Sequence, residues 1–160
     1  MTTHVIGVDP GLVHTGVVSL LFLPHHKEVS VMHTLVQGLD AAAVAAWVQT
    51  RGADKVYIEQ YRPRQSLSSD TRMVQAEQDL RREIPGARFL PNMGIKRVIT
   101  EDLMRLLEVW KFTTSTHHQD LRSAARIALL GMVKNPDTNR ALADVVEAHV
   151  NGKPWTVSHA

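Results

Sequence analysis

The chain has 160 residues, of which 44% are hydrophobic, so it is long and apolar enough for one folded domain and its composition does not favour disorder. It contains no cysteine, which excludes disulfides and thiolate metal sites and leaves carboxylates, histidines, carbonyls and water as metal ligands. The net charge is only +2, but most of the Lys and Arg residues lie between residues 51 and 111. Phosphate binding would use such a distribution, and a solvated helical surface would also produce it.

The N-terminal run MTTHVIGVDPG lacks the basic leader and the long apolar stretch of a signal peptide. No apolar run approaches the roughly 20 residues that are needed to cross a bilayer. We therefore expect a soluble, cytoplasmic protein.

The first sixty residues are typical of three strands, a helix and a fourth strand. The first apolar run ends at a turn signal, Asp9-Pro10-Gly11, and the next two runs complete an antiparallel meander. Asp40 can cap a helix over residues 41–50, and the strand after it ends in an acid. The predicted strands cover residues 5–8, 14–23, 28–36 and 55–59.

The rest of the chain predicts one more strand and several helices. A polar loop over residues 62–69 precedes a helix that Ser69 or Asp70 can cap. An apolar stripe at helical spacing runs from Thr100 to Trp110, and a polar loop then leads to an alanine-rich helix. The predicted elements are a helix to residue 83, a strand over 87–90, a helical turn over 95–99, and helices over 100–110, 118–134 and 141–150.

This order of elements predicts an α/β fold with a five-stranded mixed sheet flanked by helices. The sequence shows no internal repeat and no linker that would divide it, so residues 1–152 are expected to form a single domain. Residues 153–160 are expected to be a loose C-terminal tail.

Four residues with possible metal-binding side chains stand at the ends of predicted elements. Asp9 ends the first strand and Glu59 ends the fourth. His117 and Asp120 begin the long helix, with a spacing that places them on one helix face. Strand ends in an open α/β sheet are where sites tend to assemble. Taken singly, each residue could be no more than a turn former, an exposed strand end or a helix cap.

Two acids buried side by side at strand ends would repel one another unless a cation lay between them. Carboxylate oxygens suit Mg²⁺ or Mn²⁺, and one imidazole is tolerated beside them. The four residues together therefore favour phosphodiester hydrolysis with two metal ions. One ion would lower the pKa of the attacking water and the other would stabilise the leaving oxygen.

The same residues lie in motifs that resemble those of the RuvC-type Holliday junction resolvases, in the RNase H-like superfamily, and most of all their bacteriophage-encoded members. The run Ile6-Gly7-Val8-Asp9-Pro10-Gly11 resembles the first motif, and Ile58-Glu59-Gln60 resembles the second. His117-His118-Gln119-Asp120, which opens the alanine-rich helix, resembles the C-terminal motif. Gly94-Ile95-Lys96-Arg97 resembles a basic segment that touches DNA in the family.

The resemblance implies an RNase H-like fold and a Mg²⁺-dependent endonuclease that cuts four-way DNA junctions and leaves 5′-phosphate and 3′-hydroxyl ends. Two Mg²⁺ ions, which Mn²⁺ could replace, would be held by the four candidate residues, with His117 as a ligand or a proton acceptor. Arg126 is expected to face solvent. The residues expected to contact DNA are Tyr61, Arg62, Arg64, Lys96, Arg97 and Arg122.

The resemblance also implies a homodimer, formed through the helix over residues 70–83. Met73, Ala76 and Leu80 would contribute to that contact unless they pack on their own sheet. The same core could instead cut flaps or RNA–DNA hybrids, or hold branched DNA without cutting it. No nucleotide cofactor and no membrane association are expected, and a phage-encoded protein would act in the host cytoplasm.

Overall fold

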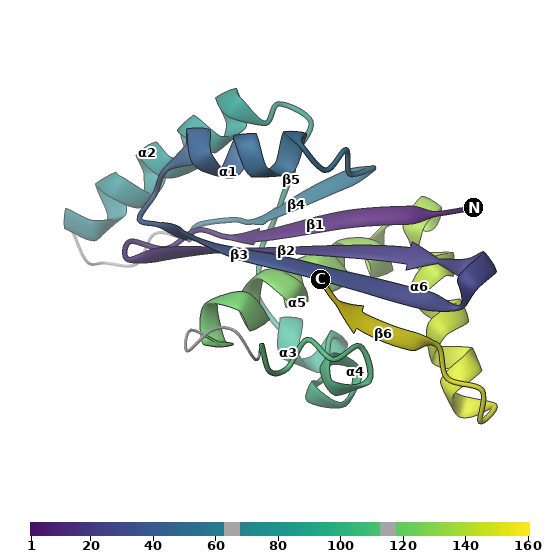
Figure 1. Cartoon of the computed structure of the whole chain (residues 1–160). Helices are drawn as coiled ribbons and strands as arrows, with labels where there is room; N and C mark the ends of the chain where they lie inside the picture. Colours follow the sequence, from purple (N-terminus) through teal and green to yellow (C-terminus); the bar gives the residue numbers. More distant parts are fainter. Residues whose placement is uncertain (63–67, 113–117) are drawn as a thin grey trace.

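The computed structural model describes residues 1–62, 68–112 and 118–160, and in this part of the chain it shows a mixed sheet with helices on both faces (Figure 1). The strands are β1 (Thr3–Asp9), β2 (His14–Leu23), β3 (Glu28–Gln37), β4 (Lys55–Glu59), β5 (Arg88–Leu90) and β6 (Thr156–His159). The helices are η1 (Pro24–His26), α1 (Ala41–Gln49), α2 (Ser68–Glu83), α3 (Ile95–Val98), α4 (Glu101–Leu106), α5 (His118–Lys134) and α6 (Pro136–Val150).

The sheet has the strand order β5-β4-β1-β2-β3-β6. β1, β2 and β3 form the predicted antiparallel meander, whereas β4 pairs parallel to β1 and β5 pairs parallel to β4. The C-terminal ends of β1, β4 and β5 therefore lie together at the same end of the sheet. The α/β prediction and the mixed sheet are confirmed, with six strands in the described residues instead of five.

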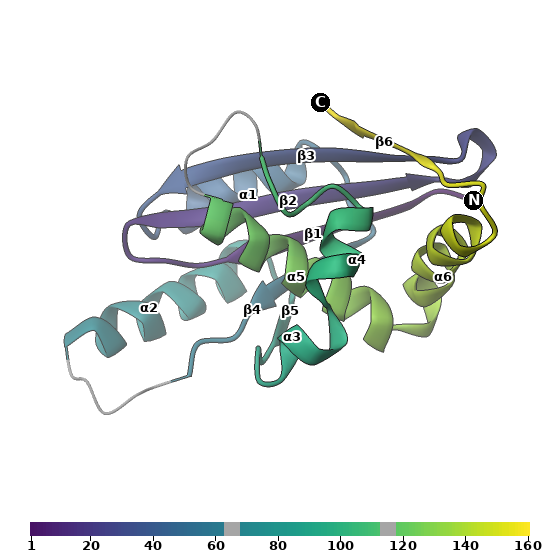
Figure 2. The same ribbon diagram turned by 90° about the horizontal axis from the view of Figure 1, so that it is seen from below.

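Each face of the sheet buries its own hydrophobic core. Figures 1 and 2 show α1 and α2 on one face and α3, α4, α5 and α6 on the other. In β1, Val5 packs in the core that contains α5, and its neighbours Ile6 and Val8 pack in the core under α1 and α2. Successive strand residues point to opposite faces, so this pattern assigns a face to every residue of β1.

Helix α5 packs closely on the sheet because glycines lie on both sides of the contact. A Cβ atom added to Gly7 would lie 2.0 Å from the carbonyl oxygen of Ala124. On the helix side, a Cβ at Gly131 would lie 2.3 Å from the ring of Tyr57. Real Cβ atoms do not approach other atoms so closely, and the helix could not occupy its present position if either glycine carried a side chain.

Two predicted helix boundaries were wrong, and both errors have a local cause. α4 ends at Leu106 instead of continuing to Trp110, because Glu108 adopts a left-handed conformation with φ of 54°. α6 begins at Pro136 instead of residue 141. Its N-cap is Asn135, whose side-chain oxygen accepts a hydrogen bond from the backbone N–H of Asp137. Pro136 is tolerated in the first helical turn because a backbone N–H at that position would have no partner within the helix.

The prediction of a loose C-terminal tail was also wrong. Residues 156–159 form β6, which pairs parallel to β3 along the edge of the sheet. The hydroxyl of Ser158 donates to the carboxylate of Glu28 at 2.7 Å, and the backbone N–H of Ala160 donates to the carbonyl of Val31. β3 would otherwise present a row of unpaired backbone groups, which β6 satisfies.

Ala76 and Leu80 decide an alternative that the sequence left open, and the position of Arg126 corrects a prediction. Ala76 and Leu80 on α2 are 4% and 3% exposed, so they pack within their own chain. Arg126, which was expected to face solvent, is 8% exposed, and its Nε donates to the carbonyl of Ile99.

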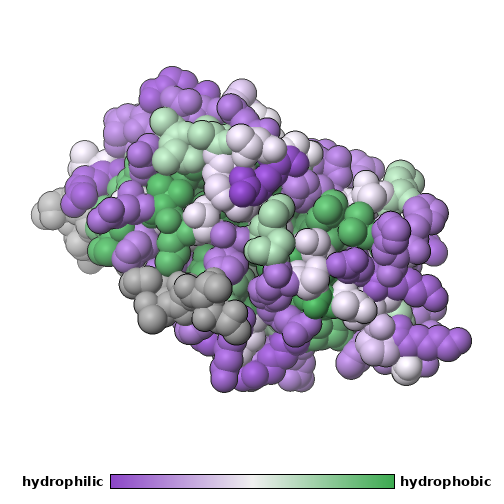
Figure 3. Space-filling view, viewed as in Figure 1, coloured by the Kyte–Doolittle hydropathy of each residue, from purple (hydrophilic) through white to green (hydrophobic). Residues whose placement is uncertain are grey.

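The face in Figure 3 shows hydrophobic residues as separate patches among hydrophilic ones. In the described residues, no helix is long and apolar enough to span a membrane.

Candidate active site

The first two candidate acids lie side by side because of strand alternation and register. Val5 and Gly7 point toward α5, so Asp9, two residues further along β1, is on the same face. In β4 the ring of Tyr57 contacts α5, and Glu59 shares its face. Val8 pairs with Ile58 across the two parallel strands, and the acids are the next residue of each strand. The adjacency predicted from the sequence is therefore what the fold produces.

Asp120 reaches the same place from α5. Residues 120, 124 and 128 are four apart and form one stripe of the helix, and Ala124 and Ala128 of that stripe contact Gly7. The first turn of α5 is equally close to the sheet, because a Cβ added to Gly16 would lie 2.4 Å from the carbonyl oxygen of Asp120. The absence of a side chain at Gly16 thus allows Asp120 to approach the end of β1.

The three carboxyl groups of Asp9, Glu59 and Asp120, which we call the acid cluster, interact strongly. Burial raises the pKa of Asp9, and the hydrogen bond to Glu59 and the negative charges of Glu59 and Asp120 raise it further, to about 10. A hydrogen bond between two carboxyl groups requires that one of them keeps a proton. In the absence of a cation, the cluster therefore holds a proton at neutral pH.

Asn92 is a member of the site that the sequence reasoning missed. Its side-chain amide donates a hydrogen bond to Oε1 of Glu59. Asn92 follows β5, which lies next to β4 in the sheet, and the backbone N–H of Gln60 bonds to the carbonyl of Leu90. A polar residue just after a strand that is parallel to the acid-bearing strands was the available signal.

A hollow of about 490 Å³ opens beside Glu59, and some of the predicted DNA-contacting residues line it. Tyr61 is half-buried and Arg62 is exposed at this hollow. Lys96 and Arg97 are exposed on α3 and line a neighbouring hollow of about 330 Å³, and Asn92 lines both. The fold thus places these basic side chains next to the acid cluster. The full lining of the first hollow, called the Glu59 hollow below, is Pro10, Glu59, Gln60, Tyr61, Arg62, Met73 and Asn92.

Arg122 is engaged elsewhere. Its Nε donates to the backbone carbonyl of Trp110, and its guanidinium lies 4.1 Å from the centre of the indole ring. Two other predicted site residues, Arg64 and His117, lie outside the described residues. The neighbouring His118 accepts a hydrogen bond from the backbone N–H of Phe112 at its Nδ1, so this imidazole joins the start of α5 to the segment before it.

The donor set of the acid cluster suits a hard divalent cation. Carboxylate oxygens are the ligands that Mg²⁺ and Mn²⁺ prefer, and a cation would reverse the repulsion that raises the pKa of Asp9. Within residues 1–62, 68–112 and 118–160, no group of three or more acidic or histidine side chains is arranged so that it could hold a metal ion. The predicted fourth ligand, His117, lies outside these residues.

Comparison with known proteins identifies the fold. A solved structure of Thermus thermophilus RuvC matches 96% of this chain and 99% of its own, with a TM-score of 0.60 and 14% sequence identity. The T. thermophilus RuvC that was solved in complex with a Holliday junction substrate matches 79% of this chain and 90% of its own, with a TM-score of 0.59 and 18% identity. The chain therefore has the RNase H-like fold of RuvC, as the motifs predicted. No protein-family model and no curated protein sequence matches it.

Proposed function

We propose that this protein is a structure-selective endonuclease that cuts four-way DNA junctions. The observation that carries the proposal is the acid cluster, whose three residues come from three separate elements. Burial and the neighbouring carboxyl groups of Glu59 and Asp120 raise the pKa of Asp9. Repulsion between these carboxylates destabilises the fold, and a bound cation would replace it by attraction, so such a cluster is typical of a cation-binding functional site. The likeness in fold to RuvC, one structure of which holds a Holliday junction substrate, supports branched DNA as the substrate.

In this proposal the acid cluster and His117 hold two divalent cations, Mg²⁺ or Mn²⁺. Such ions supply the hydrolysis chemistry, because they lower the pKa of water and offset the negative charge on a phosphodiester. Asn92 holds Oε1 of Glu59 and thereby fixes the orientation of that carboxylate. His117 either completes the ligand set or accepts a proton. The products would be a 5′-phosphate and a 3′-hydroxyl.

The basic residues beside the acid cluster would bind the DNA backbone. Lys96 and Arg97 are exposed at the hollow that Asn92 also lines, so they would contact phosphates near the cut. Arg62 would do the same from the Glu59 hollow, and Tyr61 would stack on a base at the branch point. Arg64 and Arg122 complete the proposed set of DNA-contacting residues.

Symmetric cutting of a four-way junction requires two active sites, so the proposed enzyme acts as a two-fold homodimer. Ala76 and Leu80 are buried within the chain, and a contact made by α2 would use its outer face. Val74, on that helix, is 41% exposed.

The test is cleavage of a synthetic four-way junction with Mg²⁺, beside a linear duplex, a flap and an RNA–DNA hybrid of matched sequence. We expect paired symmetric nicks in the junction alone, with ends that DNA ligase can reseal. Asp9→Asn should abolish them. Asp144→Asn is the matched control, because this acid lies in a surface pair with Arg140 on α6.

The other outcomes separate the alternatives. Cutting of the flap or the hybrid at equal rates would overturn the junction specificity and retain a nuclease. Binding without cutting by the wild-type protein, with either Mg²⁺ or Mn²⁺, would contradict the enzyme and leave a DNA-binding module. Equal cutting by Asp9→Asn would show that the acid cluster is not the active site.

A further inference from the structure

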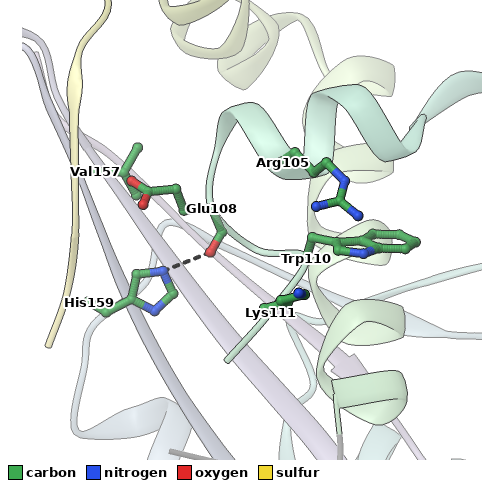
Figure 4. A pocket seen from close by; sticks show the side chains of 6 residues that line it. All are labelled: Arg105, Glu108, Trp110, Lys111, Val157 and His159. Carbon is green, nitrogen blue, oxygen red and sulfur yellow. Dashed lines mark hydrogen bonds between the residues drawn. The ribbon is translucent and has the colours of Figure 1, made fainter. Parts of the chain in front are cut away.

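A third hollow, remote in sequence from Asp9 and Glu59, is lined by basic and aromatic side chains. It measures about 470 Å³ and lies between β6 and the segment that follows α4 (Figure 4). We call it the Trp110 hollow. It is lined by Arg105, Glu108, Trp110, Lys111, Val157 and His159.

Cationic groups gather around the indole of Trp110. The guanidinium of Arg105 lies 5.3 Å from the ring centre and that of Arg122 lies 4.1 Å from it. Lys111 is the next residue in the chain and is exposed. Figure 4 shows Arg105 beside the indole and Lys111 on the same side of the hollow. Guanidinium groups held against an aromatic ring are oriented in advance, which lowers the entropic cost of binding an anion.

These cations are not neutralised by buried acids. Arg105 contacts Glu101 through Nε at 3.4 Å, in a pair whose side chains are 52% and 50% exposed, so water weakens that attraction. Among the residues that the structure describes, Glu108 is the one acid that lines the hollow. Figure 4 shows its carboxylate directed toward Val157 and not toward Arg105 or Lys111. The side of the hollow near Trp110 is therefore electropositive.

The hollow is a built feature of the fold. His159 on β6 donates from Nε2 to the backbone carbonyl of Glu108 at 2.7 Å, and its ring packs against Phe112 at 5.9 Å between ring centres. The left-handed conformation of Glu108 turns the chain there and leads it to Trp110. The C-terminal strand thus forms one wall of the hollow and holds the opposite wall in place.

The Trp110 hollow also adjoins the first turn of α5. Arg122, which contacts Trp110, is only two residues after Asp120, and His118 binds the backbone of Phe112. Residues two apart on a helix point in different directions, so the hollow and the acid cluster lie on different sides of α5 near its start, where one branched DNA molecule can reach both.

We propose that the Trp110 hollow binds the sugar–phosphate backbone of a DNA arm next to the strand that is cut. This inference rests on the proposed function, since it extends the same DNA surface beyond α3. Arg105 and Lys111 would contact phosphate oxygens, and Trp110 would keep the guanidinium groups in position. The contacts would be independent of base sequence, as contacts to phosphates are.

The test measures binding of the four-way junction to full-length protein that carries Asp9→Asn, so that no cutting occurs, at several salt concentrations. Adding Arg105→Gln and Lys111→Gln should weaken binding roughly fivefold to tenfold and lower the slope of log K against log salt by about 1 to 2. Glu108→Gln should strengthen binding about twofold, because it removes the acid from the hollow. Arg140→Gln is the control, since this cation is 85% exposed on α6 and should change neither quantity.

Thermal melts of each variant exclude loss of folding as the cause of weaker binding. Unchanged affinity and salt slope in the Arg105/Lys111 double variant would overturn the proposal, and so would an equal loss in Arg140→Gln. Failure of the proposed function gives a different result: the wild-type protein would cut none of the DNA substrates, whether or not the hollow variants bind the junction less tightly.

Discussion

Replacing Asp9 by Asn should make the metal-free protein more stable, although it removes an acid that we propose to be catalytic. Each unit by which folding raises a pKa corresponds to about 1.4 kcal/mol of free energy of unfolding at a pH where the unfolded group is ionised. The pKa of Asp9 is raised from 3.8 to about 10. Solvent and small movements of Glu59 and Asp120 reduce much of the cost of burial and repulsion. We therefore expect Asp9→Asn to raise the free energy of unfolding by about 1–3 kcal/mol.

The sign of the pH dependence follows from the same shift. Between about pH 4 and pH 10 the folded chain keeps a proton on Asp9 that the unfolded chain has released, so stability is lost as pH rises through this range. In EDTA, the melting temperature of the wild-type protein should fall from pH 5 to pH 9. The Asp9→Asn variant should lack this component and melt several degrees higher at pH 8, at roughly 2–4 °C per kcal/mol.

A divalent cation should reverse the order of the two melting temperatures, so that the wild-type protein melts above Asp9→Asn. Wild-type protein should gain about 2.7 kcal/mol when Mn²⁺ is present at 100 times its Kd, whereas Asp9→Asn should gain little. The assay is a set of thermal melts in EDTA and in Mn²⁺ at pH 6 and pH 8, with Asp144→Asn as the surface control. If Asp9→Asn melts lower than the wild type in EDTA, and Mn²⁺ has no effect on either, the repulsion argument is refuted.

Three further predictions concern residues around and away from the acid cluster. Gly16→Ala should reduce junction cleavage by about 100-fold and also lower the melting temperature, because its Cβ would push the backbone of Asp120 and the start of α5 out of position. Unaltered activity in a nicking assay would contradict this. Asn92→Ala should lower kcat about tenfold through loss of its bond to Glu59, and an effect confined to KM would argue for a role in DNA binding instead. Burial lowers the pKa of His4, so below about pH 6.5 the unfolded chain binds more protons than the folded chain. The free energy of unfolding should therefore fall as the pH drops from 7 to 5. Thermal melts of His4→Gln should show a smaller fall in melting temperature over this range.

The acid pair could be predicted from the sequence because it depends on local rules. A short apolar run that ends in Asp9, and another that ends in Glu59, each indicate a strand with an acid at its end. Parallel neighbours bring such ends together, so the fold class was enough to place the two side chains in contact. Helical spacing predicted only that Asp120 shares a helix face with His117, and the approach of Asp120 to the pair depends on how α5 packs on Gly7 and Gly16.

The features that the sequence did not reveal all depend on contacts between distant residues. Asn92 follows a predicted strand, but only the pairing of β5 with β4 brings its amide to Glu59, and the sequence does not give that pairing. β6 is only 4 residues long, and its stability comes from the open edge of β3, which is more than a hundred residues earlier in the chain. The burial of Arg126 depends on its contact with the carbonyl of Ile99, which only tertiary structure supplies.

The origin of the acid cluster in three separate elements has a consequence for the chain as it is synthesised. β1 and β4 can pair once the ribosome has released the first part of the protein, and they bring Asp9 and Glu59 together with no third carboxylate. The cluster is complete only when α5 docks on Gly7 and Gly16, after most of the chain has emerged. A nascent chain or a fragment that ends before α5 therefore lacks the site, and any cutting of DNA is restricted to molecules that have finished folding.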